Sequence, residues 1–195
     1  MRWMAADEKE LVRRSRKLIG IDLDWEGLIK NSIISGRVYG NLQALPFDDN
    51  SFDLVTANMV VEHLEHPELV LKQVHRVLRP DGRFIFHTPN VRSEITRVSS
   101  RIPRGIKKPL IRILEHRKEE DVFVTAYRLS TFGAICVAAA ANAFRVDQVS
   151  AVSTSAMTAA LGRIAIPELL YLRVLEMPAL EQLGSNLPVV LQKAA

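Results

Sequence analysis

The chain has 195 residues, of which 48% are hydrophobic, with nine glycines and nine prolines, so a collagen-like or disordered chain is excluded and one globular domain with a buried core is expected. The net charge of +4 comes from one segment, because residues 92–118 carry nine basic and two acidic side chains. The single cysteine, Cys136, excludes a disulfide framework, and the most apolar run, Phe132–Phe144, is shorter than the ~20 residues that span a bilayer. With no apolar signal segment at the start, we expect a soluble, cytoplasmic protein.

The first half of the sequence alternates between helix and strand patterns. Apolar residues at helical spacing predict a helix over Ala6–Leu18, and the apolar run Leu18–Asp22 predicts a strand. Val38–Leu42 is a second, weaker strand candidate. Turn-forming residues at 45–51 then precede a mostly apolar strand, Phe52–Asn58.

The next segment is a helix that Pro67 begins and Pro80-Asp-Gly82 stops, followed by a strand over Arg83–Thr88. This order predicts an α/β fold with a doubly wound, mainly parallel sheet covered by helices. We expect Leu18–Asp22, Phe52–Asn58 and Arg83–Thr88 to run parallel in one sheet.

The second half opens with the basic stretch 92–118, whose prolines indicate short helices around a loop. An apolar helix is predicted over Ser130–Ala143, and a mostly helical segment over Ala156–Leu183. Val146–Val152 and Pro188–Gln192 are strand candidates, and we expect the last to run antiparallel at one side of the sheet.

A carboxylate, Asp22, ends the first predicted strand. In doubly wound folds such a residue can accept two hydrogen bonds from a ribose diol. The alternative is that such a carboxylate is an ordinary strand-end residue that caps the next helix. For Asp24, which precedes Trp25, we prefer this capping role.

A longer series of motifs, LPFDDNSFDLV at 45–55, VVEHL at 60–64 and RVLRPDGRF at 76–84, resembles the class I S-adenosylmethionine (SAM)-dependent methyltransferases over about residues 10–90. The resemblance implies a Rossmann-like fold and SAM as the cofactor. It implies that Asp22 binds the ribose hydroxyls and that Leu23 lies against the adenine. Core packing is an alternative for Leu23 that is compatible with this contact.

Three further positions correspond to cofactor contacts of the family. Asn41 stands where the family usually has Asp accepting from the adenine amino group, a bond that an amide oxygen can also accept. Leu42 would supply a backbone N–H and an apolar contact to the base; core packing is an alternative for Leu42 that is compatible with this contact. Asn58, at the end of its strand, would face the methionine part of SAM.

Glu62, His63 and His66 form a polar cluster near the expected substrate position. The resemblance makes His63 the candidate catalytic residue, because a histidine can take a proton from a hydroxyl acceptor; a structural role is the alternative. EHLEH does not have the HExxH spacing of zinc sites, so we expect no metal. Transfer from an activated sulfonium depends mainly on holding acceptor and methyl in line.

The acceptor is less defined. His87-Thr88-Pro89-Asn90 and residues 121–128 resemble a subgroup associated with glycan or lipid-linked substrates, and a small-molecule acceptor is equally compatible. The basic stretch 92–118 is most simply a solvated, lysine- and arginine-rich connector. The resemblance implies alternatively that it covers the substrate opening, where its cations could hold a phosphate or carboxylate. It has no aromatic residue, which counts against nucleic acid as a partner.

Within the family, a glycine-rich loop follows the first strand and contacts the cofactor. No glycine precedes Gly20 here, so we expect a chain truncated before this strand and loop, and weak SAM binding unless the chain is extended upstream. A non-catalytic fragment or partner-binding subunit is therefore an alternative. A nicotinamide-dependent dehydrogenase is disfavoured, because the glycine fingerprint is absent and no tyrosine has a lysine four residues on.

Overall fold

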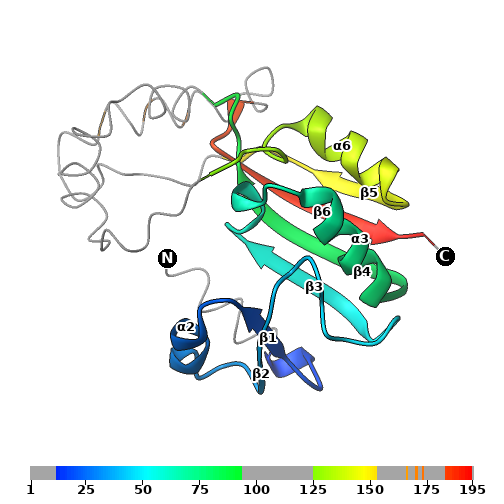
Figure 1. The fold of residues 1–195 in the computed structure, drawn as a ribbon. Helices are drawn as coiled ribbons and strands as arrows, with labels where there is room; N and C mark the ends of the chain where they lie inside the picture. The colour runs from blue at the N-terminus through cyan, green and yellow to red at the C-terminus, as the bar shows by residue number, and fades with distance from the viewer. Residues whose placement is uncertain are drawn as a thin grey trace. The chain divides into compact units, whose positions relative to one another are not determined.

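The computed structural model describes residues 12–93, 125–152, 166, 170, 173 and 183–194. The chain divides after Asp48 into two compact units, Met1–Asp48 and Asp49–Ala195 (Figure 1). No helix among the residues described is long and apolar enough to cross a membrane.

The first unit contains a small parallel sheet. Strand β1 (Ile19–Asp22) pairs with β2 (Gly36–Tyr39), and helix α2 (Trp25–Lys30) connects them. Asp24 is the N-cap of α2, where its Oδ1 accepts a hydrogen bond of 3.0 Å from the Gly27 N–H, which confirms the capping role. The strand predicted over Val38–Leu42 is β2, which begins at Gly36 and ends at Tyr39. It ends before Leu42 because the chain turns at Asn41, whose carbonyl accepts a hydrogen bond from the Ala44 N–H.

The N-terminal helix is shorter in the described residues than the apolar spacing predicts. Residues 12–14 are helical, residues 15–18 are not, and those before 12 lie outside the described part of the chain. The Ser15 N–H bonds to the Val12 carbonyl at 3.3 Å, a tight turn that closes the helical segment.

The second unit is built on a four-stranded sheet in the order β3-β4-β6-β5. Strands β3 and β4 are parallel, whereas β6 is antiparallel to both of its neighbours. The elements of this unit are β3 (Phe52–Asn58), the short helix η1 (Val61–His63), α3 (Pro67–Val77), β4 (Leu78–Pro89), α6 (Phe132–Ala141), β5 (Phe144–Val149) and β6 (Asn186–Lys193).

The α/β class and several elements agree with the sequence prediction, but two expectations about the sheet are wrong. The three strands expected in one sheet are divided, because β1 pairs with β2 while β3 and β4 belong to the four-stranded sheet. Among the described residues no strand joins the two ladders. β6 is antiparallel as expected, yet it lies inside its sheet, because β5 pairs with its outer edge.

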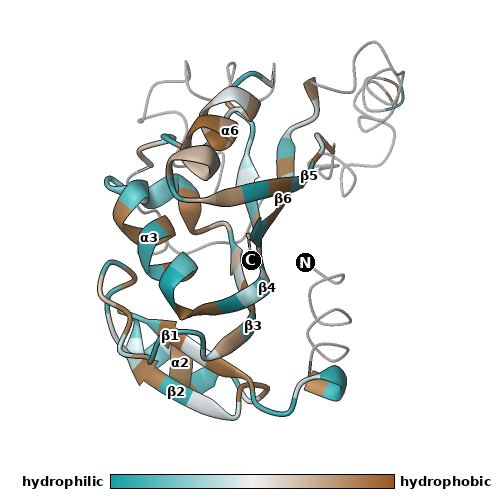
Figure 2. Ribbon diagram, turned by 90° about the vertical axis from the view of Figure 1, so that its right-hand side faces the viewer, coloured by the Kyte–Doolittle hydropathy of each residue, from teal (hydrophilic) through white to brown (hydrophobic). Residues whose placement is uncertain are grey.

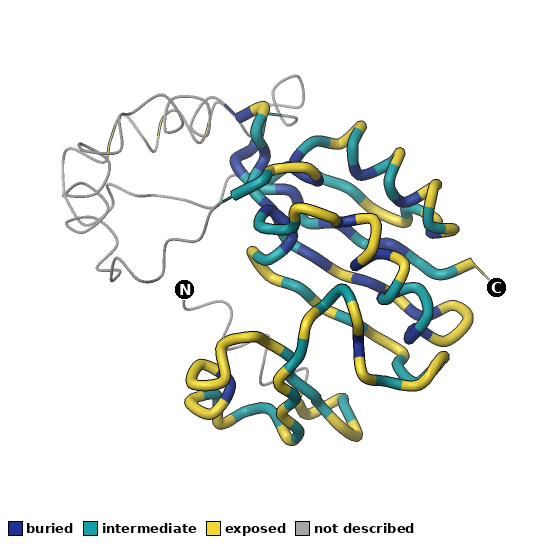
Figure 3. The backbone as a smooth tube through the Cα atoms, in the orientation of Figure 1, coloured by how far each residue is buried: buried dark blue, intermediate teal, exposed yellow. Residues whose placement is uncertain are grey.

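One face of the four-stranded sheet carries the core. Buried residues alternate along β4 and β6, helix α3 packs against β4, and α6 packs against β5 and α3. Both helices lie on the same side of the sheet (Figures 1 and 2). Figure 3 shows the buried backbone concentrated in these elements. The largest fully buried side chains are Phe86, Leu78, Ile135, Leu191, Val61, Val77 and Val189.

A tight turn separates α3 from the extended part of β4. Asp81 has a φ of 64°, and a Cβ at Gly82 would lie 2.8 Å from the Arg79 carbonyl oxygen, so only glycine fits there. The register between β3 and β4 shifts across this turn. Helix α3 ends at Val77, three residues before Pro80, and the Pro80-Asp-Gly82 segment lies within β4, which begins earlier than the strand predicted over Arg83–Thr88. Of the basic insert 92–118, only Arg92 and Ser93 are among the described residues, and most of Ala156–Leu183 also lies outside them.

Candidate functional site

The carboxyl ends of β3 and β4 bring two polar side chains together. Asn58 is the last residue of β3, and the parallel register places it opposite His87 on β4. The Asn58 Oδ1 and His87 Nδ1 atoms are 3.1 Å apart, and the Met59 N–H donates to the His87 carbonyl at 2.9 Å. Burial lowers the pKa of His87 below its usual value near 6.5. In open α/β sheets, ligands bind at this edge.

The short helix η1 follows β3 at the same edge and carries Glu62 and His63. Glu62 is 2% exposed, its Oε2 atom has no hydrogen-bond partner, and its Oε1 lies 3.9 Å from His63 Nε2. Burial raises the pKa of the Glu62 carboxyl above its usual value. The hydrogen bond from its own backbone N–H and the charge of the nearby His63 have smaller effects, which lower this pKa. This places a partly exposed imidazole next to a buried carboxyl group.

The chain returns to η1 after residue 124. The Glu62 carbonyl accepts the N–H groups of Ala126 at 2.7 Å and Tyr127 at 3.0 Å. His66, expected beside Glu62 and His63, instead contacts Glu68 at 3.2 Å in the exposed first turn of α3. The predicted cluster is therefore divided, because His63 stays beside the buried Glu62 whereas His66 lies beside Glu68 at an exposed position.

A set of buried hydrogen bonds, which we call the buried clasp, lies at the end of β4 and is formed by Thr88, Asn90 and Ser130. The Asn90 side chain donates to the Gly184 carbonyl at 2.9 Å and accepts from the Arg92 N–H at 3.0 Å. Its backbone N–H donates to the Ser185 carbonyl, and the Thr88 and Ser130 hydroxyls are 3.3 Å apart. Within the His87-Thr88-Pro89-Asn90 motif, Thr88 and Asn90 thus hold distant parts of the chain together.

In the first unit, Asp22 is the last residue of β1 and Leu23 follows it. Asp22 is exposed, and its Oδ1 accepts the Asp24 N–H at 3.0 Å, which uses one of the two carboxylate oxygens. Leu23 is 59% exposed, so it is not the core residue that the alternative proposed. An exposed carboxylate beside an exposed apolar side chain has the chemistry that a nucleoside requires: acceptors for the ribose and apolar surface for the base.

Asn41 and Leu42 lie at the same edge of this small sheet, because the Gly40 N–H donates to the Asp22 carbonyl at 3.2 Å. The Asn41 Oδ1, expected to accept from adenine, already accepts the Gln43 N–H at 2.9 Å. An amide oxygen has a second lone pair, so both bonds are compatible. Four of the five expected cofactor residues therefore belong to the first unit, and Asn58 belongs to the second.

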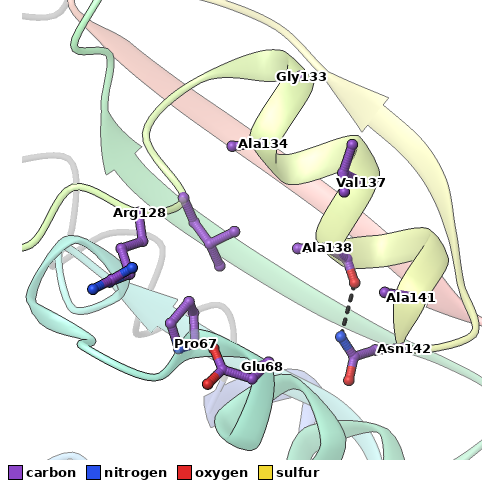
Figure 4. A pocket seen from close by; sticks show the side chains of 10 residues that line it. Pro67, Glu68, Arg128, Gly133, Ala134, Val137, Ala138, Ala141 and Asn142 are labelled. Atoms are coloured by element: carbon purple, nitrogen blue, oxygen red, sulfur yellow. Dashed lines mark hydrogen bonds between the residues drawn. The ribbon is translucent and has the colours of Figure 1, made fainter.

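A pocket in the second unit lies between the amino end of α3 and helix α6 (Figure 4). It has a volume of about 390 Å³ and an apolar lining of small side chains from α6, with Glu68 and Arg128 as its charged residues. None of the sequence-predicted site residues lines it. Within the described residues, no group of three side chains could hold a metal ion.

Sequence reasoning named His87 only as part of a motif and did not identify its contact with Asn58. The available signal was positional, because each residue lies at or near the end of a predicted parallel strand, and such ends meet at one edge. The docking of Ala126 and Tyr127 on Glu62 had no sequence signal, since it joins backbone atoms more than 60 residues apart.

Residues 6–86 match a family model described as a methyltransferase domain. The malonyl-[acyl-carrier protein] O-methyltransferase 1 of Coxiella burnetii is 34% identical over 80 residues, which cover 41% of this chain and 28% of that protein. The mouse mitochondrial 2-methoxy-6-polyprenyl-1,4-benzoquinol methylase is 44% identical over 48 residues, covering 25% and 15%. The matches thus span less than a third of these relatives.

Two solved structures with a similar fold are described as SAM-dependent methyltransferases. The enzyme of Mesorhizobium loti has a TM-score of 0.61 at 17% identity, with 98% of this chain and 86% of that one covered. A second, from Methanosarcina mazei, has a TM-score of 0.59 at 15% identity, with 95% and 86% covered. At these identities the similarity concerns the fold.

Proposed function

We propose that the chain is a class I SAM-dependent methyltransferase, which is supported by the methyltransferase-domain match of residues 6–86 and by the similar fold of solved methyltransferases. We further propose that it transfers a methyl group from SAM to a small-molecule, glycan or lipid-linked acceptor. The observation that carries the proposal is the exposed Asp22 carboxylate at the end of β1 with the exposed Leu23 beside it, inside the segment matched by the family model. These residues fit the ribose and adenine of the cofactor.

Each cofactor residue has a separate task in this proposal. Asp22 accepts hydrogen bonds from the ribose hydroxyls, Leu23 and Leu42 offer apolar surface to the base, and Asn41 accepts from its amino group. Asn58 faces the methionine part. When bound, SAM supplies a methyl group already activated by the sulfonium charge, so the protein mainly positions the acceptor in line with it. His63 is the candidate residue for taking a proton from the acceptor.

The acceptor proposed is anionic. Residues 92–118 carry a net charge of +7 in the sequence, which favours a phosphate or carboxylate nearby. Two hydrogen bonds hold the described residues that flank positions 94–124 near the carboxyl edge of the sheet. The Arg92 N–H donates to the Asn90 side-chain oxygen, and the Ala126 N–H donates to the Glu62 carbonyl. The two relatives above are named for a malonyl thioester carrier and a polyprenyl benzoquinol, so the acceptor class differs among similar proteins.

The proposal is tested by isothermal titration of the chain with SAM, with SAM concentrations extended to the millimolar range. We expect saturable binding that Asp22→Ala weakens. Transfer of radioactive methyl is then measured to two probes, malonyl-acyl carrier protein and 2-methoxy-1,4-benzoquinol. Absence of saturable SAM binding would refute the proposed activity for this chain.

A second candidate function is that of a non-catalytic, partner-binding subunit. It is favoured by the sheet order, in which β3 is a terminal strand and β1 pairs with β2 alone among the residues described. Terminal strands offer backbone groups to a strand from another chain. Saturable SAM binding with methyl transfer would exclude this function, whereas a stable complex without SAM binding would support it.

A further inference from the structure

A single residue of η1 holds the segment that follows position 124. The N–H groups of Ala126 and Tyr127 both donate to the Glu62 carbonyl oxygen, at 2.7 Å and 3.0 Å. Within the described part of the chain, residues 125–127 form no further hydrogen bond. We call residues 125–127 the anchor segment. In contrast, β4, against which η1 packs, is an inner strand that pairs with β3 on one side and with β6 on the other.

The backbone of the anchor segment is strained. Tyr127 has a φ of 51°, in the left-handed region that a bulky side chain rarely adopts. Such a conformation persists only where the surrounding contacts enforce it. The two N–H groups on the Glu62 carbonyl enforce it here, because Tyr127 is itself exposed and gains little from packing. Release of the anchor segment would let this backbone relax.

The carboxyl group of Glu62 is buried and incompletely paired. The residue is 2% exposed, and its Oε2 atom has no hydrogen-bond partner. A carboxylate in such surroundings is costly to bury, whereas a carboxyl group that keeps its proton carries no charge. Burial therefore raises the pKa of Glu62. Ionisation of this group requires that water reach the unpaired oxygen.

The anchor segment is the part of these surroundings that can open most easily. Strand β4 could move only by breaking its ladders with β3 and β6, whereas residues 125–127 are released by breaking two hydrogen bonds to one carbonyl. The strain at Tyr127 favours this release. Local openings of this kind occur in native proteins without global unfolding.

Few charged groups face Glu62 among the described residues. On η1 itself, His63 Nε2 lies 3.9 Å from Glu62 Oε1, and its positive charge opposes the effect of burial. On β4, the buried side chains near this end do not titrate, and His87 lies on the opposite face. The exposed titratable or charged side chains on the segments beside η1 are Glu65, His66, Glu68, Tyr127 and Arg128.

We propose that Glu62 is a proton-dependent switch for the anchor segment. While the carboxyl group is protonated, residues 125–127 stay fastened to η1. When the proton passes to water, the carboxylate becomes hydrated, the two hydrogen bonds to the Glu62 carbonyl break, and Tyr127 leaves its left-handed conformation. The switch acts beside His63 at the carboxyl edge of the sheet. It needs no cofactor, so it does not depend on the function proposed above.

Opening of the anchor segment should depend on pH in a defined way. In the open state the Glu62 carboxyl has its ordinary pKa near 4.5, and in the closed state burial raises that pKa. The closed state thus binds the proton more tightly, so the opening constant should rise roughly tenfold per pH unit between the two pKa values. Above the higher pKa the opening constant should stay level.

Two NMR measurements on the full chain without ligand test this relation. Titration of the isotope-labelled Glu62 carboxyl gives its pKa in the closed state. Amide hydrogen exchange from about pH 5 to about pH 8 gives the protection factors of the Ala126 and Tyr127 N–H groups, corrected for the intrinsic exchange rate at each pH. We expect both factors to fall roughly tenfold per pH unit and to level off at the Glu62 midpoint. They should stay below the protection factors of the β4 amides, which exchange on global unfolding.

Matched variants separate the switch from a purely structural role. Glu62→Gln cannot ionise, so the protection of Ala126 and Tyr127 should no longer depend on pH. Glu68→Gln, at an exposed position in the first turn of α3, should behave as the wild type. The Asn142 N–H, which donates to the Ala139 carbonyl at 3.1 Å, is the internal control, and its protection should stay constant.

Several results would each overturn the switch. One is a Glu62 carboxyl that titrates near its ordinary value of 4.5. Another is constant protection of Ala126 and Tyr127 while Glu62 titrates, or an unchanged pH dependence in Glu62→Gln. Protection equal to that of the β4 amides would also exclude it, because the anchor segment would then open only when the whole unit unfolds.

Discussion

The two units of the chain differ in how much apolar surface they bury. In Met1–Asp48 the buried apolar side chains among the described residues are Leu28 and Leu45, each 8% exposed. In Asp49–Ala195 a continuous core joins β4 and β6 to α3 and α6, with several side chains at 2% exposure or less. Figure 3 shows this contrast as dark blue in the second unit and mostly yellow and teal in the first.

The difference matters because the expected cofactor contacts are not distributed evenly. Asp22, Leu23, Asn41 and Leu42 belong to the unit with little core, whereas Asn58, His63 and His87 stand on the well-packed sheet or beside it. A two-stranded sheet is marginally stable on its own. We therefore expect SAM to stabilise the first unit, since a ligand that binds only the folded state shifts the folding equilibrium by mass action.

The largest expected effect tests the core of the second unit. Phe86→Ala removes a 2% exposed ring from an inner strand and should lower the free energy of unfolding by about 3–5 kcal/mol. Leu23→Ala, at a 59% exposed position of the first unit, should change it by about 0.5 kcal/mol or less. Urea denaturation followed by circular dichroism measures both, and similar losses would contradict the contrast between the units.

The next prediction concerns ligand binding by the first unit. Asp22→Ala removes the charged acceptor expected to bind the ribose and should weaken SAM binding by roughly 1.5–3 kcal/mol. Asp53→Ala is the matched control, because Asp53 is an exposed carboxylate in the second unit that pairs with Arg79 at 2.7 Å. Isothermal titration compares the dissociation constants, and an unchanged value for Asp22→Ala would remove Asp22 from the site.

The buried clasp of the second unit should have an effect of similar or smaller size. Asn90→Ala would leave the Gly184 carbonyl and the Arg92 N–H without their partner, which should lower the free energy of unfolding by about 1–3 kcal/mol. Asn142→Ala removes a partly buried bond to the Ala138 carbonyl at the end of α6, and it should cost less. Equal losses in thermal denaturation would show that the clasp has no special structural role.

Local patterns were sufficient to predict much of the fold. The bounds of β3, the start of α3 at Pro67 and the capping of α2 by Asp24 depend on neighbouring residues, so periodicity and turn chemistry identify them. The division into two sheets and the inner place of β6 depend on strand pairing between distant segments. Sequence periodicity contains no information about such partners.

The contacts of the candidate site divide in the same way, into those with a local sequence signal and those that depend on distant parts of the chain. Asp22 was predictable because it ends an apolar strand, and Asn58 because it ends another. The bond from Asn90 to Gly184 joins residues 94 positions apart, and that from His87 to Asn58 joins residues 29 apart. Neither bond has a local signature, so tertiary structure was needed to identify these contacts.

The smallest expected effect concerns the buried carboxyl of Glu62. Because burial raises its pKa above the usual value near 4.5, the folded chain holds the proton more tightly than the unfolded chain does. This group's contribution therefore lowers stability as pH rises from 4.5 through the raised folded pKa, and the penalty persists at neutral pH. Glu62→Gln removes the charge with almost no change of shape, so it should be more stable than the wild type near neutral pH.

The advantage of Glu62→Gln should vanish as the pH falls below 4.5, where the wild-type carboxyl is protonated in both states. Urea denaturation at about pH 4 and about pH 7.5 measures the difference. Glu68→Gln, at an exposed position in the first turn of α3, is the matched control and should show no such gain. Lower stability of Glu62→Gln at neutral pH would mean that the ionised carboxylate stabilises the fold, and His63, 3.9 Å away, would then be its cationic partner.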